Sequence, residues 1–565
     1  MSAAVEAPEL WGLVAKALWR KTRRRLRAGP GWRFRYAGRT PDRLLIAPPD
    51  LRVADPQIAQ DIYYGRFPFA GKVVETSGRS PFHIKVASPE WVEALQNFHW
   101  LRHLRAAQTE LAAVNARALV GEWIGLHGKR ISHPAWDAGI TASRVISWLQ
   151  HSSIVLQGAD FAFYRQFLKA LSVQVRYLRA VVAEMPMGED RLRVRIALAF
   201  ASLSLPVSAA SLRTATRCLA EELDRQILPD GGHISRSPLA VLELLADLLP
   251  LRQTYANQSA TPPQALLGAV DRMLPALRFF RHQDGSLARF NGMGVTVHDR
   301  VAAILRHDDA GAAPLLHAPH SGYERLSMGG TTVIADTGAA PAVDHSAQAH
   351  AGCLSFELSS SRRSFIVNAG VDTFGARDFR PLARATAAHS TAVFNDASSA
   401  RFNLAGMNGL LGTPLVAGPR AVRSRRLDEG RNGSTLQGFI ASHDGYLQRF
   451  GLFHERQLVL SDGGQMLEGI DRFHAAQNGL PRSGHVAIRF HVHPDAELER
   501  DGDSLTIQGR DGEGWIFRCG EVRAEIEDSI FFAGLAGPAR TKQIVLHYDA
   551  AEHPTLAWRF TRIAV

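Results

Sequence analysis

Several histidines and arginines occur in patterns that could support acid–base chemistry on a charged substrate. His345 follows Asp344, and an imidazole oriented by a carboxylate is a candidate general base. His233 follows the turn Asp230–Gly232, which predicts a position at a helix N-terminus facing a groove. Arg236 is then expected on the same helical face, where it could bind a carboxylate. The alternatives are a surface-loop role for His345 and a capping or packing role for His233.

The net charge favours an anionic ligand. Among 565 residues, 65 are basic and 54 acidic, which gives a formal net charge of +11, and 58 of the basic residues are arginine. The planar guanidinium suits carboxylate, sulfate or phosphate. The basic residues are spread along the chain and no nucleic-acid-binding motif is present, so we do not expect nucleic acid as a partner.

Composition excludes several classes of protein. Hydrophobic residues make up 46% and charged residues 21%, which excludes disordered and fibrous chains. There is no apolar run of about 18 residues, so a membrane-spanning helix is not expected. The cysteines Cys218, Cys353 and Cys519 are too few and too scattered for a disulfide framework or a cysteine-based zinc site.

The first residues resemble a signal peptide only in part, because the basic cluster follows the short apolar stretch. Leu10, Val14, Ala17 and Leu18 fall on one helical face beside Trp11. Residues 10–27 therefore predict an amphipathic helix that could make peripheral contact with an anionic membrane. The alternative is a docked or frayed terminal helix.

The spacing of apolar residues predicts helices first and strands second. Helical spacing recurs over 91–118, 136–157, 160–185, 190–204, 209–226, 237–257 and 262–282. Consecutive helices without strands indicate an all-α layer, either a solenoid or a closed toroid.

After residue 315, period-2 segments with turn residues predict a large antiparallel β-sandwich. Hairpin turns are expected at 359–363, 462–464 and 511–512. The predicted organisation is a basic lead-in segment over 1–89, a helical domain over 90–314 and a sandwich over 315–565.

Three local stretches resemble the heparinase II/III family. Asp230–Pro238 reads DGGHISRSP, His350–Phe356 reads HAGCLSF with Gly352 at the family's Asp, and Arg384–Thr391 reads RATAAHST. The resemblance implies an N-terminal α/α toroid, a C-terminal antiparallel β-sandwich, and β-elimination of an acidic, uronate-containing polysaccharide. Such a lyase neutralises the uronate carboxylate, removes the C5 proton with a base and protonates the leaving oxygen.

The chain departs from the family at the positions that the resemblance marks as catalytic. Asp190 replaces the neutralising Asn and Arg191 its neighbouring His. Ala240 stands where a Tyr is expected, and Gln348 where the family has a sandwich His. Arg191 could still bind the uronate as a bidentate clamp.

Tyr446 recurs in a turn that the family shares and could supply a phenol. Arg384, in an arginine cluster before His389, could bind an anionic glycan. Structural roles are the alternative for both side chains.

The resemblance also implies a structural metal site in the sandwich. Its positions correspond to His350, Asn368 and His389, and two imidazoles with an amide oxygen could hold zinc with reduced affinity. The alternative is that both histidines hydrogen-bond to strand backbones. His485, His491 and His493 also alternate on one segment, where ordinary strand residues are the preferred interpretation.

Three functions fit these residues. The first is a polysaccharide lyase with Asp190, Arg191, His233, Arg236 and His345 near the cleaved bond. The second is a catalytically degenerate glycan-binding protein on the same scaffold, favoured by Asp190, Ala240 and Gln348. The third is a hydrolase with Asp190 as one of two carboxylates. The lack of a clear signal peptide predicts the cytoplasm, whereas the family's usual surroundings predict the cell envelope.

Overall fold

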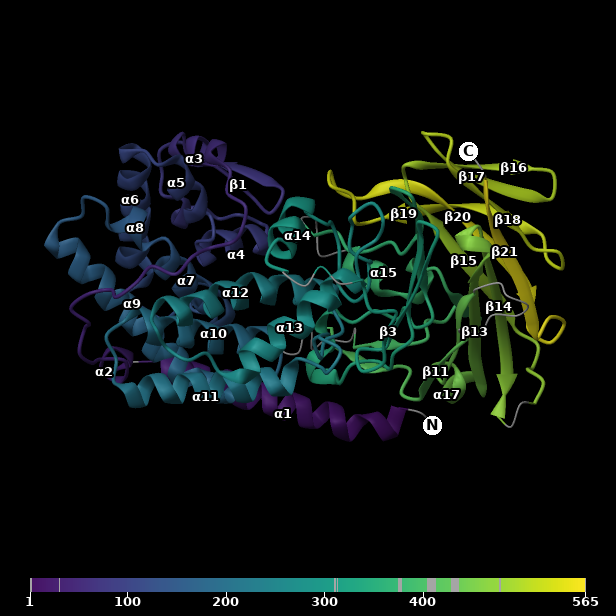
Figure 1. Ribbon diagram of the computed structural model, residues 1–565. Coiled ribbons are helices and arrows are strands. Elements are labelled where there is room, and N and C mark those ends of the chain that lie inside the picture. Colours follow the sequence, from purple (N-terminus) through teal and green to yellow (C-terminus); the bar gives the residue numbers. More distant parts are fainter. Residues whose placement is uncertain are drawn as a thin grey trace.

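The computed structural model has two different halves, helices first and sheets second (Figure 1). The last long helix ends at Leu305 and the first strand of the sandwich begins at His317. This order agrees with the apolar spacing of the sequence. The residues described are 3–29, 31–308, 311, 313–373, 379–403, 413–427, 436–476 and 479–563.

The helical half is an α/α toroid, and side-chain caps fix several of its helix starts. Asp160 accepts a hydrogen bond from the Phe163 amide, and Thr109 one from the Ala112 amide. The helices are α3 (Pro56–Tyr63), α4 (Pro89–Asn97), α5 (Leu101–Ala107), α6 (Glu110–His127), α7 (Ala138–Gln150), α8 (Ser152–Leu156), α9 (Phe161–Val181), α10 (Glu189–Ser204), α11 (Ala209–Gln226), α12 (Pro238–Asn257), α13 (Gln264–Phe279) and α14 (His298–Leu305).

Two helices, α7 and α10, lie at the centre of this half. Every residue of α7 from Ile140 onward is buried, as is every residue of α10 from Ile196 onward. Helices that are covered on all sides must be apolar all round or have internal partners for their polar groups. Arg144 of α7 illustrates the second case, because it donates to Gln174 and lies 4.0 Å over the Trp123 ring.

The N-terminal segment lies along the outside of the toroid. Helix α1 (Ala3–Ala28) runs along the lower edge in Figure 1, and α2 (Trp32–Arg35) and the hairpin of β1 (Arg66–Phe69) and β2 (Lys72–Glu75) follow it. Within the described residues, no helix combines the length and apolar character needed to cross a bilayer.

The second half is a sandwich of two antiparallel sheets around one core. One sheet has the order β11-β12-β13-β14-β21-β18-β17-β16, and the other runs β19-β20-β15-β7-β6-β5-β4-β3, with β8 beside β15. Its strands are β3 (His317–Ala318), β4 (Tyr323–Met328), β5 (Thr331–Asp336), β6 (Phe356–Ser360), β7 (Arg363–Val367), β8 (Ala392–Phe394), β9 (Arg401–Phe402), β10 (Leu415–Ala417), β11 (Val422–Arg426), β12 (Gln437–His443), β13 (Leu452–Ser461), β14 (Met466–Ala475), β15 (His485–Val492), β16 (Ala496–Asp501), β17 (Ser504–Gly509), β18 (Gly514–Arg518), β19 (Ala524–Phe531), β20 (Ala539–Asp549) and β21 (Thr555–Ile563).

The three predicted hairpins are confirmed. Residues 462–464 connect β13 to β14, 511–512 lie between β17 and β18, and 359–363 join β6 to β7. Gly464 has φ +89, and a Cβ there would lie 2.1 Å from the Met328 carbonyl oxygen, so only glycine fits this turn.

Candidate functional site

A groove of about 650 Å³ lies where the toroid, the sandwich and α1 meet. The toroid contributes an aromatic and acidic wall, the sandwich contributes the loop before His350, and α1 forms the third side. Its lining residues are Leu13, Ala17, Arg20, Lys21, Arg24, Arg25, Ile131, Ser132, His133, Trp136, Asp137, Tyr177, Pro186, Val343, Asp344, Ala347 and Pro414.

Helix α1 is docked on the toroid by ion pairs. Arg23 and Arg27 contact Glu184 at 2.7 and 2.5 Å, and Arg24 lies 3.6 Å from Asp137. Val14, which the sequence places on a membrane-facing surface, is buried instead. Leu18 of the same predicted face is 50% exposed, and Leu10 lies outside the described side chains. Membrane contact through residues 10–27 therefore stays a prediction.

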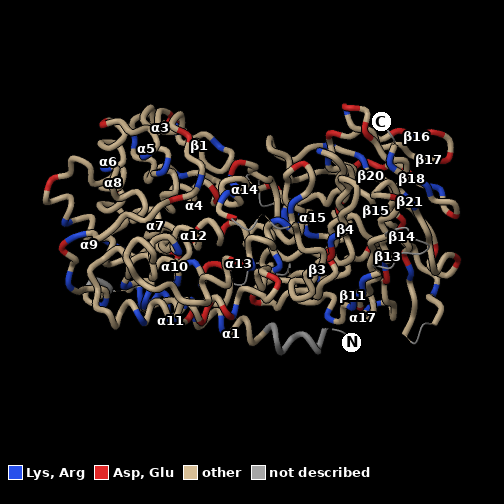
Figure 2. Tube along the Cα trace, in the orientation of Figure 1, with Lys and Arg blue, Asp and Glu red and all other residues tan. Residues whose placement is uncertain are grey.

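The groove is positive on its α1 side and mixed on the toroid side. Lys21 and Arg25 line it, and neither has a carboxylate within ion-pair distance among the described residues. Opposite them, Asp137 contacts His133 at 3.0 Å, and burial raises the pKa of Asp137. Elsewhere Lys and Arg alternate with Asp and Glu over both halves (Figure 2). Lys21 and Arg25 are thus two unpaired cations beside the groove, which suits an anionic ligand.

The side chains of Asp190 and Arg191 lie in different surroundings. These two residues are the predicted replacements for the family's Asn and His. Asp190 is exposed and lies 3.5 Å from Arg193. The Arg191 guanidinium turns away and donates through Nε to the buried Glu222 at 3.0 Å. A second bond goes to the Met185 carbonyl. Arg191 is thus held by protein partners, and its role as a carboxylate clamp stays a prediction.

His233 was expected to face a groove, but its side chain is buried. The turn at Gly231, with φ +83, folds the chain back so that His233 pairs with Ile227. Its Nδ1 lies 2.7 Å from Ser235 Oγ and its Nε2 2.8 Å from Gln226 Oε1. Burial lowers the pKa of His233 to about 3. Because both ring nitrogens have partners, its catalytic role stays an untested prediction.

Arg236 was expected on a helical face, yet it has φ +60 and precedes α12, which begins at Pro238. Proline favours the first position of a helix, which explains the later start. The buried guanidinium donates to the carboxylate of Asp336 and to the carbonyls of Ser321, Gly322, Gly338 and Ala339. Arg236 therefore joins the two halves of the molecule.

His345 is the predicted base that reaches the toroid. Its Nδ1 donates to the Met187 carbonyl at 3.0 Å, so this carbonyl, rather than Asp344, orients the ring. Arg384 fixes the same loop, because its buried guanidinium donates to the carbonyls of Ala349 and Ser346 at 2.7 and 3.0 Å. Glycan binding by Arg384 stays a prediction.

The side chains of Tyr446, Ala240 and Gln348 are not available as catalytic groups. Tyr446 is buried in the sandwich core and its hydroxyl donates to the Ala392 carbonyl at 2.9 Å. Ala240 is fully buried in α12. Gln348 accepts a hydrogen bond from Arg380 at 3.3 Å. None of these three side chains presents a free acid or base to the groove.

His350 and His389 form a hydrogen-bonded chain, and Asn368 contacts Ser390, the residue after His389. His389 Nδ1 donates to the Ala385 carbonyl, which leaves Nε2 as an acceptor for His350 Nδ1 at 2.9 Å. His350 Nε2 in turn accepts from the Gly292 amide at 3.1 Å, and the oxygen of Asn368 accepts from the Ser390 amide.

Both imidazole lone pairs are therefore taken, and zinc ligands need them free. A Cβ at Gly352, where the family carries Asp, would also lie 2.7 Å from the His389 ring. The donor set as arranged does not fit zinc. Zinc at this site stays an untested prediction.

The sequence did not reveal a charged cluster inside the toroid. Arg52, from the lead-in segment, contacts Asp247 of α12 at 2.6 Å, and Arg193 lies 3.7 Å from the same carboxylate. Glu189, beside Asp190, has its pKa raised to about 7 by burial. A carboxyl group with this pKa suits general acid–base chemistry at neutral pH. Arg52, Asp247 and the α10 residues Glu189 and Arg193 come from three parts of the chain, so no local spacing could have indicated the whole cluster.

The comparisons with known proteins support the fold. Residues 310–559 match the family described as Heparinase II/III-like, C-terminal. A heparinase III crystal structure superposes with a TM-score of 0.70 at 15% identity, covering 94% of this chain and 88% of that one. Heparan sulfate lyase HepC from Pedobacter heparinus gives 0.59 at 17% identity, covering 98% and 88%. The predicted α/α toroid and β-sandwich are confirmed.

A relative matches over nearly its whole length. FtsZ-localized protein C of Caulobacter vibrioides is 32% identical over 569 residues, which cover 98% of this chain and 96% of that protein.

Proposed function

The chain belongs to the heparinase II/III-like family, and on that premise we propose that it is a catalytically degenerate member that binds an acidic glycan without cleaving it. Its fold is that of polysaccharide lyases. The ligand would lie in the groove beneath α1.

One observation carries this proposal: the side chains of His233, Arg236 and Tyr446 are buried and hydrogen-bonded inside the protein, although Asp190 is exposed. His233 and Arg236 have internal partners at every described polar atom that a substrate would need. Ala240 cannot supply a phenol, and Gln348 is not a base at neutral pH. β-Elimination needs a base, an acid and a neutralising group in one place.

The binding part of the proposal rests on charge and shape. Lys21 and Arg25 project into a groove that also contains Trp136 and Tyr177. Basic side chains pair with carboxylates and sulfates. The rings of Trp136 and Tyr177 are buried behind the groove wall, so the exposed cations of α1 supply the surface for an acidic chain.

Binding of heparin, heparan sulfate, alginate and hyaluronan to the full chain can be measured by calorimetry. The double variant Lys21→Gln/Arg25→Gln should weaken binding roughly five- to tenfold, since exposed ion pairs contribute up to about 1 kcal/mol each. The matched control Arg213→Gln/Arg510→Gln removes two exposed arginines elsewhere and should change nothing. An equal loss of glycan affinity in both double variants would contradict a binding site under α1.

A second proposal concerns where the protein acts. The relative matched over almost the full chain is named for its localisation with FtsZ. We infer that this chain also localises with FtsZ, and that the fold has been retained there without its lyase chemistry. A fluorescent fusion in the source organism should overlap with FtsZ, and a diffuse signal during division would contradict the inference.

A third proposal concerns peripheral membrane contact by α1. Trp11, Leu18, Trp19 and Leu26 are 66, 50, 62 and 67% exposed, and lie on the face opposite the groove. Apolar side chains flanked by arginines suit the surface of an anionic bilayer.

Cosedimentation with anionic and neutral vesicles tests this contact. The full chain should bind anionic vesicles, and Trp11→Ser/Trp19→Ser should reduce binding. Phe161→Ser is the control, because Phe161 is 79% exposed on another helix. If Phe161→Ser reduces vesicle binding as much as Trp11→Ser/Trp19→Ser does, α1 is not the membrane contact.

A further inference from the structure

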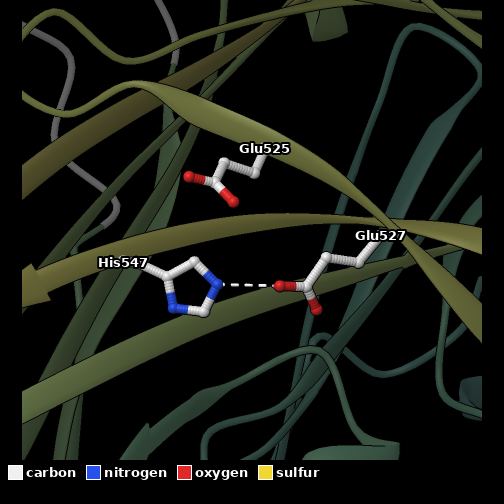
Figure 3. Close-up of side chains that lie close together, drawn as sticks. All are labelled: Glu525, Glu527 and His547. Carbon is white, nitrogen blue, oxygen red and sulfur yellow. Dashed lines mark hydrogen bonds and ion pairs between the residues drawn. The ribbon is translucent and has the colours of Figure 1, made fainter.

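The outer face of the sandwich carries a cluster of metal-ligating side chains far from the groove. Glu525 and Glu527 project from β19, and His547 from the neighbouring strand β20 (Figure 3). One possible ligand atom from each of the three residues lies within 4.8 Å of those of the other two. Zinc at about 2.0–2.2 Å from each ligand requires separations only slightly above 3 Å, so small side-chain rotations suffice.

We propose that Glu525, Glu527 and His547 form a binding site for a divalent transition-metal ion, with zinc as the best fit. Two carboxylates and one imidazole leave a fourth position for water. An imidazole ligand favours zinc over the oxygen-seeking ions calcium and magnesium.

The ring of His547 is already oriented as a ligand. Its Nε2 lies 2.8 Å from Glu527 Oε1, on the side where the ion would sit, while its Nδ1 lies 3.0 Å from Nε2 of His485. The two rings are stacked with centroids 5.1 Å apart. A partner on the far ring nitrogen is the usual support of a metal-bound histidine.

The carboxylate of Glu527 is also oriented by neighbouring side chains. Its Oε2 accepts hydrogen bonds from Arg489 Nη1 at 3.1 Å and Gln543 Nε2 at 3.2 Å, which leaves Oε1 directed at His547. Glu525 is exposed, and no hydrogen bond or ion pair is found for it among the described residues. An unpaired carboxylate beside another carboxylate is a repulsive arrangement that a cation would relieve.

The position of the cluster indicates what the ion would do. Strand β19 is the edge of its sheet and pairs only with β20 among the described strands. A metal ion ligated from both strands would cross-link the edge strand β19 to its neighbour β20.

Zinc binding to the chelator-treated full chain tests the site, by competition with a fluorescent zinc indicator. The expected result is one ion per chain. Glu525→Gln and His547→Gln should each weaken binding at least tenfold, and His485→Ala, which removes only the ring support, by roughly ten- to a hundredfold. Zinc should also raise the melting temperature of the wild-type chain but not of His547→Gln.

Two controls decide where the ion sits. His553→Gln removes a half-buried histidine that pairs with Glu521 at 3.4 Å and should leave zinc binding unchanged. His389→Gln tests the family position and should also leave it unchanged. Failure of the wild-type chain to bind zinc, or undiminished binding in both Glu525→Gln and His547→Gln, overturns the proposal. Circular dichroism of each variant establishes that it is folded.

Discussion

Arg236, two residues before α12, donates to the carboxylate of Asp336 at the end of β5, and so joins the toroid to the sandwich. Both side chains are buried. The guanidinium also lies 4.9 Å over the ring of Tyr323, whose hydroxyl donates to the Arg236 carbonyl. An arginine that the family-like segment places next to the predicted site is therefore a joint between the two halves.

Replacing Asp336 with Asn should destabilise the protein strongly. The variant leaves the Arg236 charge buried and uncompensated, which costs about 3–5 kcal/mol. Urea denaturation measures this loss. The control Asp511→Asn removes an exposed partner of Arg363 and should cost less than about 1 kcal/mol. Similar losses in the two variants would mean that the Arg236 contact does not hold the halves together.

His233 should make stability depend on pH. Its pKa in the folded protein is lowered to about 3, against about 6.5 for an ordinary histidine. Because the folded protein keeps this imidazole neutral, His233 makes its full contribution to the free energy of unfolding above about pH 6.5. That contribution is lost as the pH falls toward 3, at about 1.4 kcal/mol per pH unit.

The comparison of wild type with His233→Gln isolates this effect, since other buried histidines contribute to both proteins. Between about pH 7 and about pH 5, the free energy of unfolding of wild type should fall by about 2 kcal/mol more than that of the variant. Parallel pH profiles would show that His233 is not held neutral by burial.

Restoring the family's tyrosine should not restore activity. Ala240 is fully buried in α12, so Ala240→Tyr overpacks the helix and should cost about 1–3 kcal/mol. The control Ala210→Tyr, on the exposed start of α11, should change stability by less than about 0.5 kcal/mol. Thermal melts compare the two variants, and a stable Ala240→Tyr protein with new lyase activity would contradict this account.

Local features of the fold could be predicted from the sequence. The Gly463–Gly464 turn and the alternation of β13 depend on neighbouring residues, so their positions followed from spacing alone. The helix-to-strand order followed in the same way. The lost groups at Ala240 and Gln348 were also visible, because a resemblance compares residues position by position.

The contacts that give the site its character could not be predicted in this way. Arg236 is buried because Asp336, 100 residues later, folds against it. Helix α1 covers the groove because Glu184 and Asp137 hold its arginines. The His350–His389 contact likewise depends on how two separate loops meet. Each of these contacts arises from tertiary packing, and no short-range pattern encodes it.

The most direct test of the central claim follows the ultraviolet absorbance of unsaturated uronate while the purified full chain is incubated with heparin, heparan sulfate, alginate and hyaluronan. The account predicts that absorbance does not rise with any of the four, while calorimetry on the same preparation detects binding of at least one. A rise that disappears in Glu189→Gln or His345→Ala would contradict it and establish a working lyase.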